Sequence, residues 1–240
     1  MRAAPCERPD LRRRRLVAGA AACLLAACAP QVPRPLEGAG QPPPGFPDAH
    51  YRQVAARGLA VFTVDPALSL VVIEVRRAGS LAHLGHDHVV AGHDIRGYVA
   101  PDEGRADLYL RLDALAVDEP ELRAEAKFDT QPSAAAIAGT RENMLGKLRS
   151  DEHPYAVVAV RRADTGAGPL TATLTLNGVA RTVPVAAQME TAAGGLNATG
   201  RFTLAQTAFG IAPFSILGGA LKVEDEVTVR FVIRARRAPS

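Results

Sequence analysis

From Leu59 onward, apolar residues recur at every second position in a series of short segments. The clearest example lies near the C-terminus, where apolar side chains alternate with Thr and Arg at Val227, Val229, Phe231 and Ile233. Successive side chains of a β-strand point to opposite faces of the sheet, so this pattern predicts strands with one apolar face. Several such strands with few helices predict an antiparallel sandwich or barrel.

Two local signals refine this fold class. Asn177-Gly178 lies inside the alternating stretch from Leu170 to Val185, and this pair predicts a tight hairpin because both turn positions tolerate a positive φ. The Ala-rich stretch from Pro132 to Leu148 departs from the alternation. Thr140 can cap a helix there that carries apolar side chains on one side. We therefore expect one or two short helices that cover a barrel end.

The N-terminal 27 residues have the features of a targeting signal. Arg12–Arg15 form a basic segment, and an uncharged apolar run follows from Leu16 to Ala27. The run is shorter than the roughly 20 residues that a membrane-spanning helix needs, so it suits the core of a signal peptide. It ends in Leu25-Ala26-Ala27-Cys28, which resembles the lipobox of bacterial lipoproteins. This resemblance implies cleavage before Cys28 and acylation of that residue.

Lipidation of Cys28 would anchor the protein, because two or more acyl chains hold a protein on a membrane far better than one. Ala29 rather than an aspartate follows the cysteine, and by resemblance to the sorting rules of enteric bacteria this favours the outer membrane, with the domain facing the periplasm. The alternative is an ordinary secretory signal in which Cys28 is incidental. The sequence predicts three regions: signal peptide 1–27, lipidated Cys28 with a Pro-rich tether 28–58, and a β-barrel domain 59–240.

Charge and cysteine content exclude several classes of function. The net charge is +3, but residues 1–27 hold six arginines against two acidic residues, so the remaining chain has a net charge of −1. This charge and the absence of Trp argue against a nucleic-acid partner. Cys6 and Cys23 leave with the signal and Cys28 is acylated, so no thiol remains for a disulfide, a zinc–cysteine site or a nucleophile.

Five segments, in order along the chain, resemble the YceI-like family. They are Phe62–Ser69 (FTVDPALS), Arg141–Tyr155 (RENMLGKLRSDEHPY), Leu174–Val179 (LTLNGV), Phe209–Ile211 (FGI) and Gly219–Val227 (GALKVEDEV). The resemblance extends from Phe62 to about Ala235. It implies an extended lipocalin-like antiparallel barrel that binds a long isoprenoid or a similar amphiphile. Nothing in the sequence specifies an oligomeric state.

The physics of a small barrel agrees with this implied ligand. A barrel of about eight strands is either filled by its own side chains or holds one small ligand. Burial of a lipid tail contributes about 0.8 kcal/mol per CH₂, so an apolar bore suffices and no cofactor or catalytic group is required. We therefore expect a binding protein rather than an enzyme. Candidate lining residues are Phe62, Phe128, Phe209, Ile211 and Phe214, although each of them taken alone fits ordinary core packing better than a ligand wall.

Four of the six histidines lie within eleven residues, at His83, His86, His88 and His93. Three imidazoles and a water can hold a transition metal, so a metal site is one interpretation. A polar turn at the barrel rim is another, and histidines that surround the polar head of a bound lipid are a third. The order of residues does not fit the metallo-β-lactamase motif, because Gly85 stands where that motif requires its second histidine.

Three hypotheses follow. The favoured one is a membrane-tethered barrel that sequesters or transports an isoprenoid in the cell envelope. The second is a metal-binding accessory protein that uses the histidine cluster. The third is a structural lipoprotein whose barrel is filled by its own side chains.

Overall fold

The computed structural model describes residues 40–162, 170–192 and 194–237. The predictions for the signal peptide and Cys28 therefore lie outside the described residues. The described residues belong to one compact unit.

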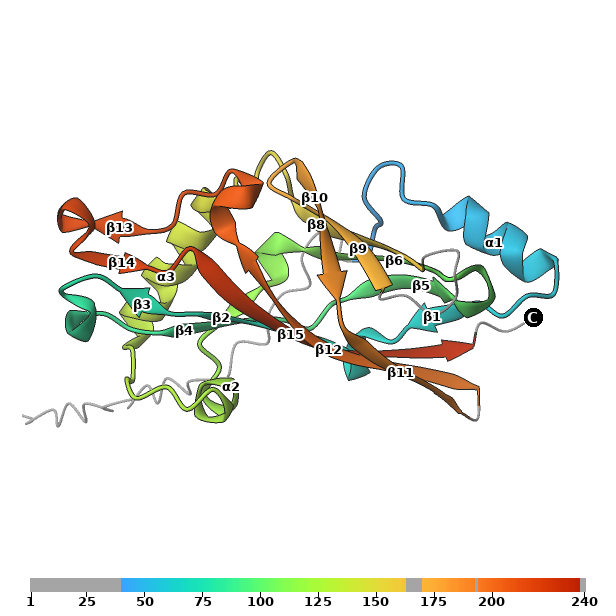
Figure 1. Cartoon of the computed structure of the whole chain (residues 1–240), viewed down its shortest axis with the longest axis horizontal. Helices are drawn as coiled ribbons and strands as arrows, with labels where there is room; N and C mark the ends of the chain where they lie inside the picture. The colour runs from blue at the N-terminus through green and yellow to red at the C-terminus, as the bar shows by residue number, and fades with distance from the viewer. Residues whose placement is uncertain (1–39, 163–169, 193, 238–240) are drawn as a thin grey trace, which may run out of the picture. The chain divides into compact units, whose positions relative to one another are not determined.

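The fold is mainly β, as the alternation predicts, and its main sheet is antiparallel throughout. Neighbouring strands of the barrel follow the order β10 (Val179–Val185), β9 (Leu170–Leu176), β8 (Tyr155–Arg161), β6 (Arg105–Arg111), β5 (Arg96–Ala100), β1 (Phe62–Val64), β15 (Glu226–Arg237), β12 (Gly195–Ala205) and β11 (Ala187–Ala192). Strand β10 continues into β11 through Ala186, so the chain passes from pairing with β9 to pairing with β12. The path thus returns to its starting point, so the strands form a barrel (Figure 1).

The long strand β15 also supports a second wall. Its C-terminal end pairs with β1, and its first half pairs with β2 (Leu70–Val75). Strand β2 then pairs with β4 (His88–Gly92), and β4 pairs with β7 (Ala116–Val117). A separate small sheet contains β13 (Ser215–Ile216), β14 (Leu221–Val223) and β3 (Arg77–Ala78). Short 3₁₀ turns are η1 (Pro66–Leu68), η2 (Ala82–Leu84), η3 (Pro101–Glu103), η4 (Leu112–Ala114), η5 (Gln206–Phe209) and η6 (Leu217–Gly219).

The predicted helical stretch forms a single helix, α3 (Ala134–Lys147). Its cap is Ser133, whose Oγ accepts a hydrogen bond from the Ala136 amide at 3.2 Å. Thr140, the predicted cap, lies inside the helix, because the Ala-rich run favours helix from its first residue. The apolar side of α3 packs against strands and turns of the second wall through Ile137, Met144, Leu145 and Leu148. A shorter helix, α2 (Pro120–Glu125), follows β7.

Helix α1 (Asp48–Ala56) lies at the opposite end of the barrel from α3 (Figure 1). Its side chains Tyr51 and Val54 are buried, and they pack with Val61 and Ala100. The sequence places residues 48–58 in the tether, whereas α1 is part of the folded unit. The burial of Tyr51 and Val54 fixes the helix on the barrel surface.

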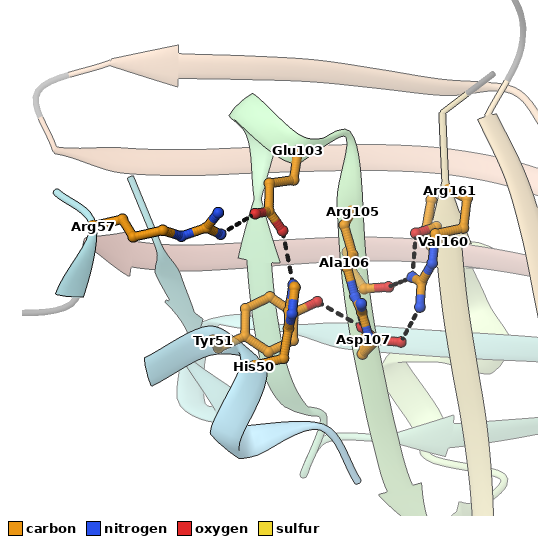
Figure 2. Close-up of polar contacts among 9 residues, drawn as sticks. All are labelled: His50, Tyr51, Arg57, Glu103, Arg105, Ala106, Asp107, Val160 and Arg161. Atoms are coloured by element: carbon orange, nitrogen blue, oxygen red, sulfur yellow. Dashed lines mark hydrogen bonds and ion pairs between the residues drawn. The ribbon is translucent and has the colours of Figure 1, made fainter. Parts of the chain in front are cut away.

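A polar network holds α1 in place (Figure 2). The Tyr51 hydroxyl donates to Oδ2 of Asp107 on β6 at 2.7 Å. Arg105 and Arg161 donate to the same carboxylate, at 2.7 and 2.9 Å. Glu103, just before β6, is within 2.7 Å of the His50 ring and also pairs with Arg57. Residues far apart in sequence therefore supply one another's hydrogen-bond and ion-pair partners where α1 meets the barrel.

Within the three described ranges, no helix combines the length and the apolar character needed to cross a membrane.

Candidate functional site

A cavity of about 410 Å³ occupies the bore of the barrel. The strands contribute alternate residues to its lining, as expected when one face of each strand points inward. Examples are Val71, Ile73 and Val75 on β2; Leu108 and Leu110 on β6; Val158 and Val160 on β8; Leu174 and Leu176 on β9; and Val227, Val229, Phe231 and Ile233 on β15. The apolar residues that recur at every second position of the sequence therefore form the wall of a cavity.

The cavity is almost entirely apolar. Its volume falls within the range of roughly 300–1,000 Å³ that is typical of small-molecule sites. An apolar cavity offers water no hydrogen-bond partners, so it favours an apolar guest. The few polar lining residues are His88, Tyr109, Thr140, Asn143, Lys147 and Gln206. Three of these, Thr140, Asn143 and Lys147, lie on one face of α3, because they are spaced three and four residues apart.

Of the five residues predicted to line a pocket, two lie on the cavity wall, namely Ile211 and Phe214. Phe62 is buried in a core cluster with Val64 and Ile95 instead. Phe209 is buried beside the hairpin turn, where its carbonyl oxygen accepts a hydrogen bond from Asn177 at 3.0 Å.

Phe128 lies away from the cavity, against arginine side chains. The guanidinium groups of Arg76 and Arg123 lie 4.9 and 5.4 Å from its ring centroid. Three cavity-lining aromatics were absent from the predicted pocket residues: Tyr109, Phe202 and Phe231. The ring centroids of Phe202 and Phe231 are 6.4 Å apart. Their positions in alternating strands were the signal that could have identified them.

The four clustered histidines do not converge. His83 is exposed in η2, and His93 is exposed and lies 2.9 Å from Glu119. The rings of His86 and His88 are closer, with centroids 6.2 Å apart. Among the residues that the structure describes, no group of three or more His, Cys, Asp or Glu side chains is arranged to hold a metal ion.

His88 alone among these histidines lines the cavity. Its Nδ1 lies 2.6 Å from Oδ2 of Asp118, whose side chain is fully buried. The other oxygen of Asp118 accepts hydrogen bonds from Nη1 of Arg123 at 2.5 Å and from the Val89 amide at 3.1 Å. Every oxygen of this carboxylate is therefore paired.

Two opposing effects act on the pKa of the Asp118 carboxyl. Burial raises the pKa, but hydrogen bonds and charge from His88, together with hydrogen bonds from Arg123 and the Val89 amide, outweigh burial and hold it below its ordinary value. Asp118 is therefore an ionised carboxylate at neutral pH. An ionised carboxylate can only accept hydrogen bonds, so the proton between these two groups resides on Nδ1 of His88.

Comparison with known proteins identifies similar sequences and folds. The model of the YceI-like domain family matches residues 62–235, which is most of the chain. A search of curated protein sequences finds no significant match.

Two solved structures have a similar fold. One is a polyisoprenoid binding domain from Saccharophagus degradans, with a TM-score of 0.53 and 12% sequence identity, over 74% of this chain and 98% of that one. The other is BcnA from Burkholderia cenocepacia, with a TM-score of 0.52 and 17% identity, over 72% of this chain and 99% of that one. At these identities the likeness shows the fold alone.

Proposed function

Because the chain belongs to the YceI-like domain family, we propose that it is a binding protein that holds a polyisoprenoid or a similar amphiphilic lipid in the bore of its barrel. The observation that carries this proposal is the apolar cavity of about 410 Å³, whose wall is built from alternate strand residues. The solved domain from Saccharophagus degradans, which is described as polyisoprenoid binding, has the same fold and lends the proposal support.

The energetics favour a lipid tail. Each methylene group that moves from water into the bore contributes about 0.8 kcal/mol, so a tail of about 15 buried carbons contributes roughly 12 kcal/mol. Association costs at least about 4 kcal/mol of this in lost translational and rotational freedom. The balance corresponds to roughly micromolar binding without any strong polar contact. A barrel filled by its own side chains, the third hypothesis from the sequence, is disfavoured by the size of the cavity.

A tryptophan reporter tests the proposal directly. The sequence contains no Trp, so an introduced indole is the sole source of tryptophan fluorescence. Leu174 lines the cavity, whereas its neighbour Thr173 on β9 does not. Titration of Leu174→Trp with geranylgeraniol, a C20 isoprenoid alcohol, is expected to change the emission in a saturable way. Thr173→Trp is the matched control and is expected to show no change.

A second experiment blocks the bore. Val158 on β8 and Val229 on β15 both line the cavity, and three strands separate β8 from β15 in the sheet order. The double variant Val158→Phe, Val229→Phe is expected to lower isoprenoid affinity at least tenfold, because the added rings occupy the space of the tail. Native mass spectrometry of wild-type protein measures bound lipid independently. Wild-type protein that binds no isoprenoid in either assay would contradict the proposed function.

We also propose that the protein acts in the cell envelope, anchored through acyl chains on Cys28 and facing the periplasm, with the outer membrane as the expected site. The lipobox-like segment that ends at Cys28 supports this proposal. Changing Cys28 to Ser is expected to move the protein from the membrane fraction to the soluble fraction. Retention of the variant in membranes would argue against the lipid anchor.

A further inference from the structure

One of the polar residues that line the cavity, His88, lies on a strand and is held by a buried carboxylate. His88 is the first residue of β4, where it pairs in register with Val75 at the end of β2. Both residues line the cavity, as does Val90, the next inward-facing residue of β4. The His88 side chain is mostly buried, with 13% of its surface exposed. Such a group is costly in an apolar wall unless it has a hydrogen-bond partner.

The protein provides a partner for only one of the two ring nitrogens. Nδ1 of His88 is held by Asp118, and Asp118 is in turn held by Arg123 and the Val89 amide. Arg123 is itself fixed, because it also donates to the carbonyl oxygens of Asp87 and Thr130. Within the described residues, Nε2 of His88 has no hydrogen-bond partner. The network therefore fixes the ring and leaves one nitrogen for a ligand.

The same network determines what that nitrogen can do. When the His88 imidazole is neutral, ionised Asp118 requires its one proton on Nδ1, so Nε2 is then an unprotonated acceptor. An acceptor in a low-dielectric bore selects a ligand group that donates a hydrogen bond. A hydroxyl group does so, whereas an ether or a carbonyl group does not.

We propose that His88 anchors the polar end of the bound lipid, and that this lipid is an isoprenoid that ends in a hydroxyl group, which donates a hydrogen bond to Nε2. This inference rests on the proposed function, because it assigns the head group of the same ligand. The tail then extends from His88 along the apolar walls, where Phe202, Phe231 and Ile233 lie.

Lys147 on α3 is the competing anchor, and it would select an anionic head group such as a phosphate. It also lines the cavity, but its side chain is exposed and is not held by another residue of the described chain. A flexible ammonium group in contact with solvent contributes little specificity. The fixed and mostly buried His88 is therefore the stronger candidate, and the two can be separated by experiment.

The test compares three probes with the same C20 tail: geranylgeraniol, its methyl ether and geranylgeranyl phosphate. Affinities are measured by competition against a fluorescent lipid probe on otherwise wild-type protein. Geranylgeraniol is expected to bind about tenfold more tightly than its methyl ether, because only the alcohol can donate to Nε2. Equal affinities of the two would overturn the inference and leave the proposed function standing. Failure of all three probes to bind would overturn both.

Variants then assign the preference to His88. His88→Asn retains an N–H group near the position of Nδ1, so Asp118 keeps a donor, but nothing replaces Nε2. His88→Phe keeps the ring and removes both nitrogens. In each variant the tenfold preference for the alcohol is expected to fall to about onefold. His86→Phe is the matched control, because His86 contacts the His88 ring but does not line the cavity, and it is expected to keep the preference.

Two results would contradict the assignment to His88. One is an alcohol preference that survives in both His88 variants. The other is tighter binding of the phosphate than of the alcohol, with the difference lost in Lys147→Met, which would place the head group at α3 instead.

Discussion

Two buried aspartates of this barrel, Asp107 and Asp118, have similar surroundings but different consequences. Asp107 accepts hydrogen bonds from Tyr51, Arg105 and Arg161, and Asp118 from His88, Arg123 and a backbone amide. Each is thus a carboxylate surrounded by arginine and one aromatic side chain. Asp107 alternates with the cavity-lining Leu108 on β6, so it faces α1 on the outer side of the barrel.

The difference lies in the aromatic partner. The Tyr51 hydroxyl has a single proton, which Asp107 accepts, and the network ends there on the outer surface. His88 has two ring nitrogens, so while Asp118 holds Nδ1, this cavity-lining residue keeps a second nitrogen that Asp118 does not occupy. A buried carboxylate therefore has only a structural role when each of its partners uses its one functional atom to bind that carboxylate. It can serve binding when one partner has a second functional atom that faces a cavity.

Of the substitutions that test this comparison, removal of the Asp118 carboxylate is expected to have the largest effect. Asp118→Ala leaves Arg123, whose side chain is 8% exposed, as an uncompensated buried charge. Loss of one partner of a buried pair costs about 3–5 kcal/mol, so we expect the free energy of unfolding to fall by that amount. Urea denaturation monitored by circular dichroism measures it. The variant is also expected to lose the preference for alcohols, because the His88 proton is no longer fixed on Nδ1.

Asp107→Ala is expected to be less damaging, at about 2–3 kcal/mol. Tyr51 loses its hydrogen-bond partner in a buried site, but Arg161 and Arg105 are 44% and 24% exposed and can turn toward solvent. The same urea experiment measures the loss. Isoprenoid affinity is expected to remain unchanged, because this network lies outside the bore. An equal loss of affinity in the two Asp variants would remove the distinction between a structural and a binding carboxylate.

The barrel could be predicted because the alternation of apolar residues within each strand is visible in the local sequence. Alternation places Val227, Val229, Phe231 and Ile233 on one face whatever the partner strands are, and the Asn177-Gly178 turn joins β9 to β10 as expected. The family resemblance carried the expectation of an apolar bore. Its choice of aromatics was less successful, because Phe128 lies between α2 and α3 and Phe209 lies in the turn η5, so tertiary contacts rather than strand alternation place their side chains.

The polar networks could not be predicted, since their members are distant in sequence. Tyr51 and Asp107 are 56 residues apart, and His88 and Asp118 are 30 apart. The density of histidines along the sequence does not by itself bring them together in space, for a related reason. His88 begins β4 and His93 follows its end, so five residues at about 3.3 Å each separate them by roughly 16 Å. Two residues that far apart cannot hold the same metal ion.

The smallest expected effect is the pH dependence of stability that the Tyr51–Asp107 hydrogen bond introduces, and it tests the comparison of the two aspartate networks. Burial, and then the hydrogen bond and charge of Asp107, raise the pKa of the Tyr51 hydroxyl well above its usual value of about 10. The folded state therefore holds this proton more tightly than the unfolded state. Its contribution to stability is complete below about pH 10 and is lost as the pH rises from there toward the raised pKa. At pH 11 the loss is about 1.4 kcal/mol for this one group.

Tyr51→Phe isolates that contribution, since Phe keeps the ring and has no proton to lose. Tyr98 and Tyr109 also have raised pKa values, mainly because they are buried, so wild type and variant both lose stability at high pH. Urea unfolding at pH 8 and pH 11 is expected to show a loss that is about 1.4 kcal/mol smaller in Tyr51→Phe than in wild type. Identical losses would mean that Asp107 does not hold the Tyr51 proton. The Tyr51 hydroxyl would then not be committed to Asp107, and the contrast with the His88 network would be lost.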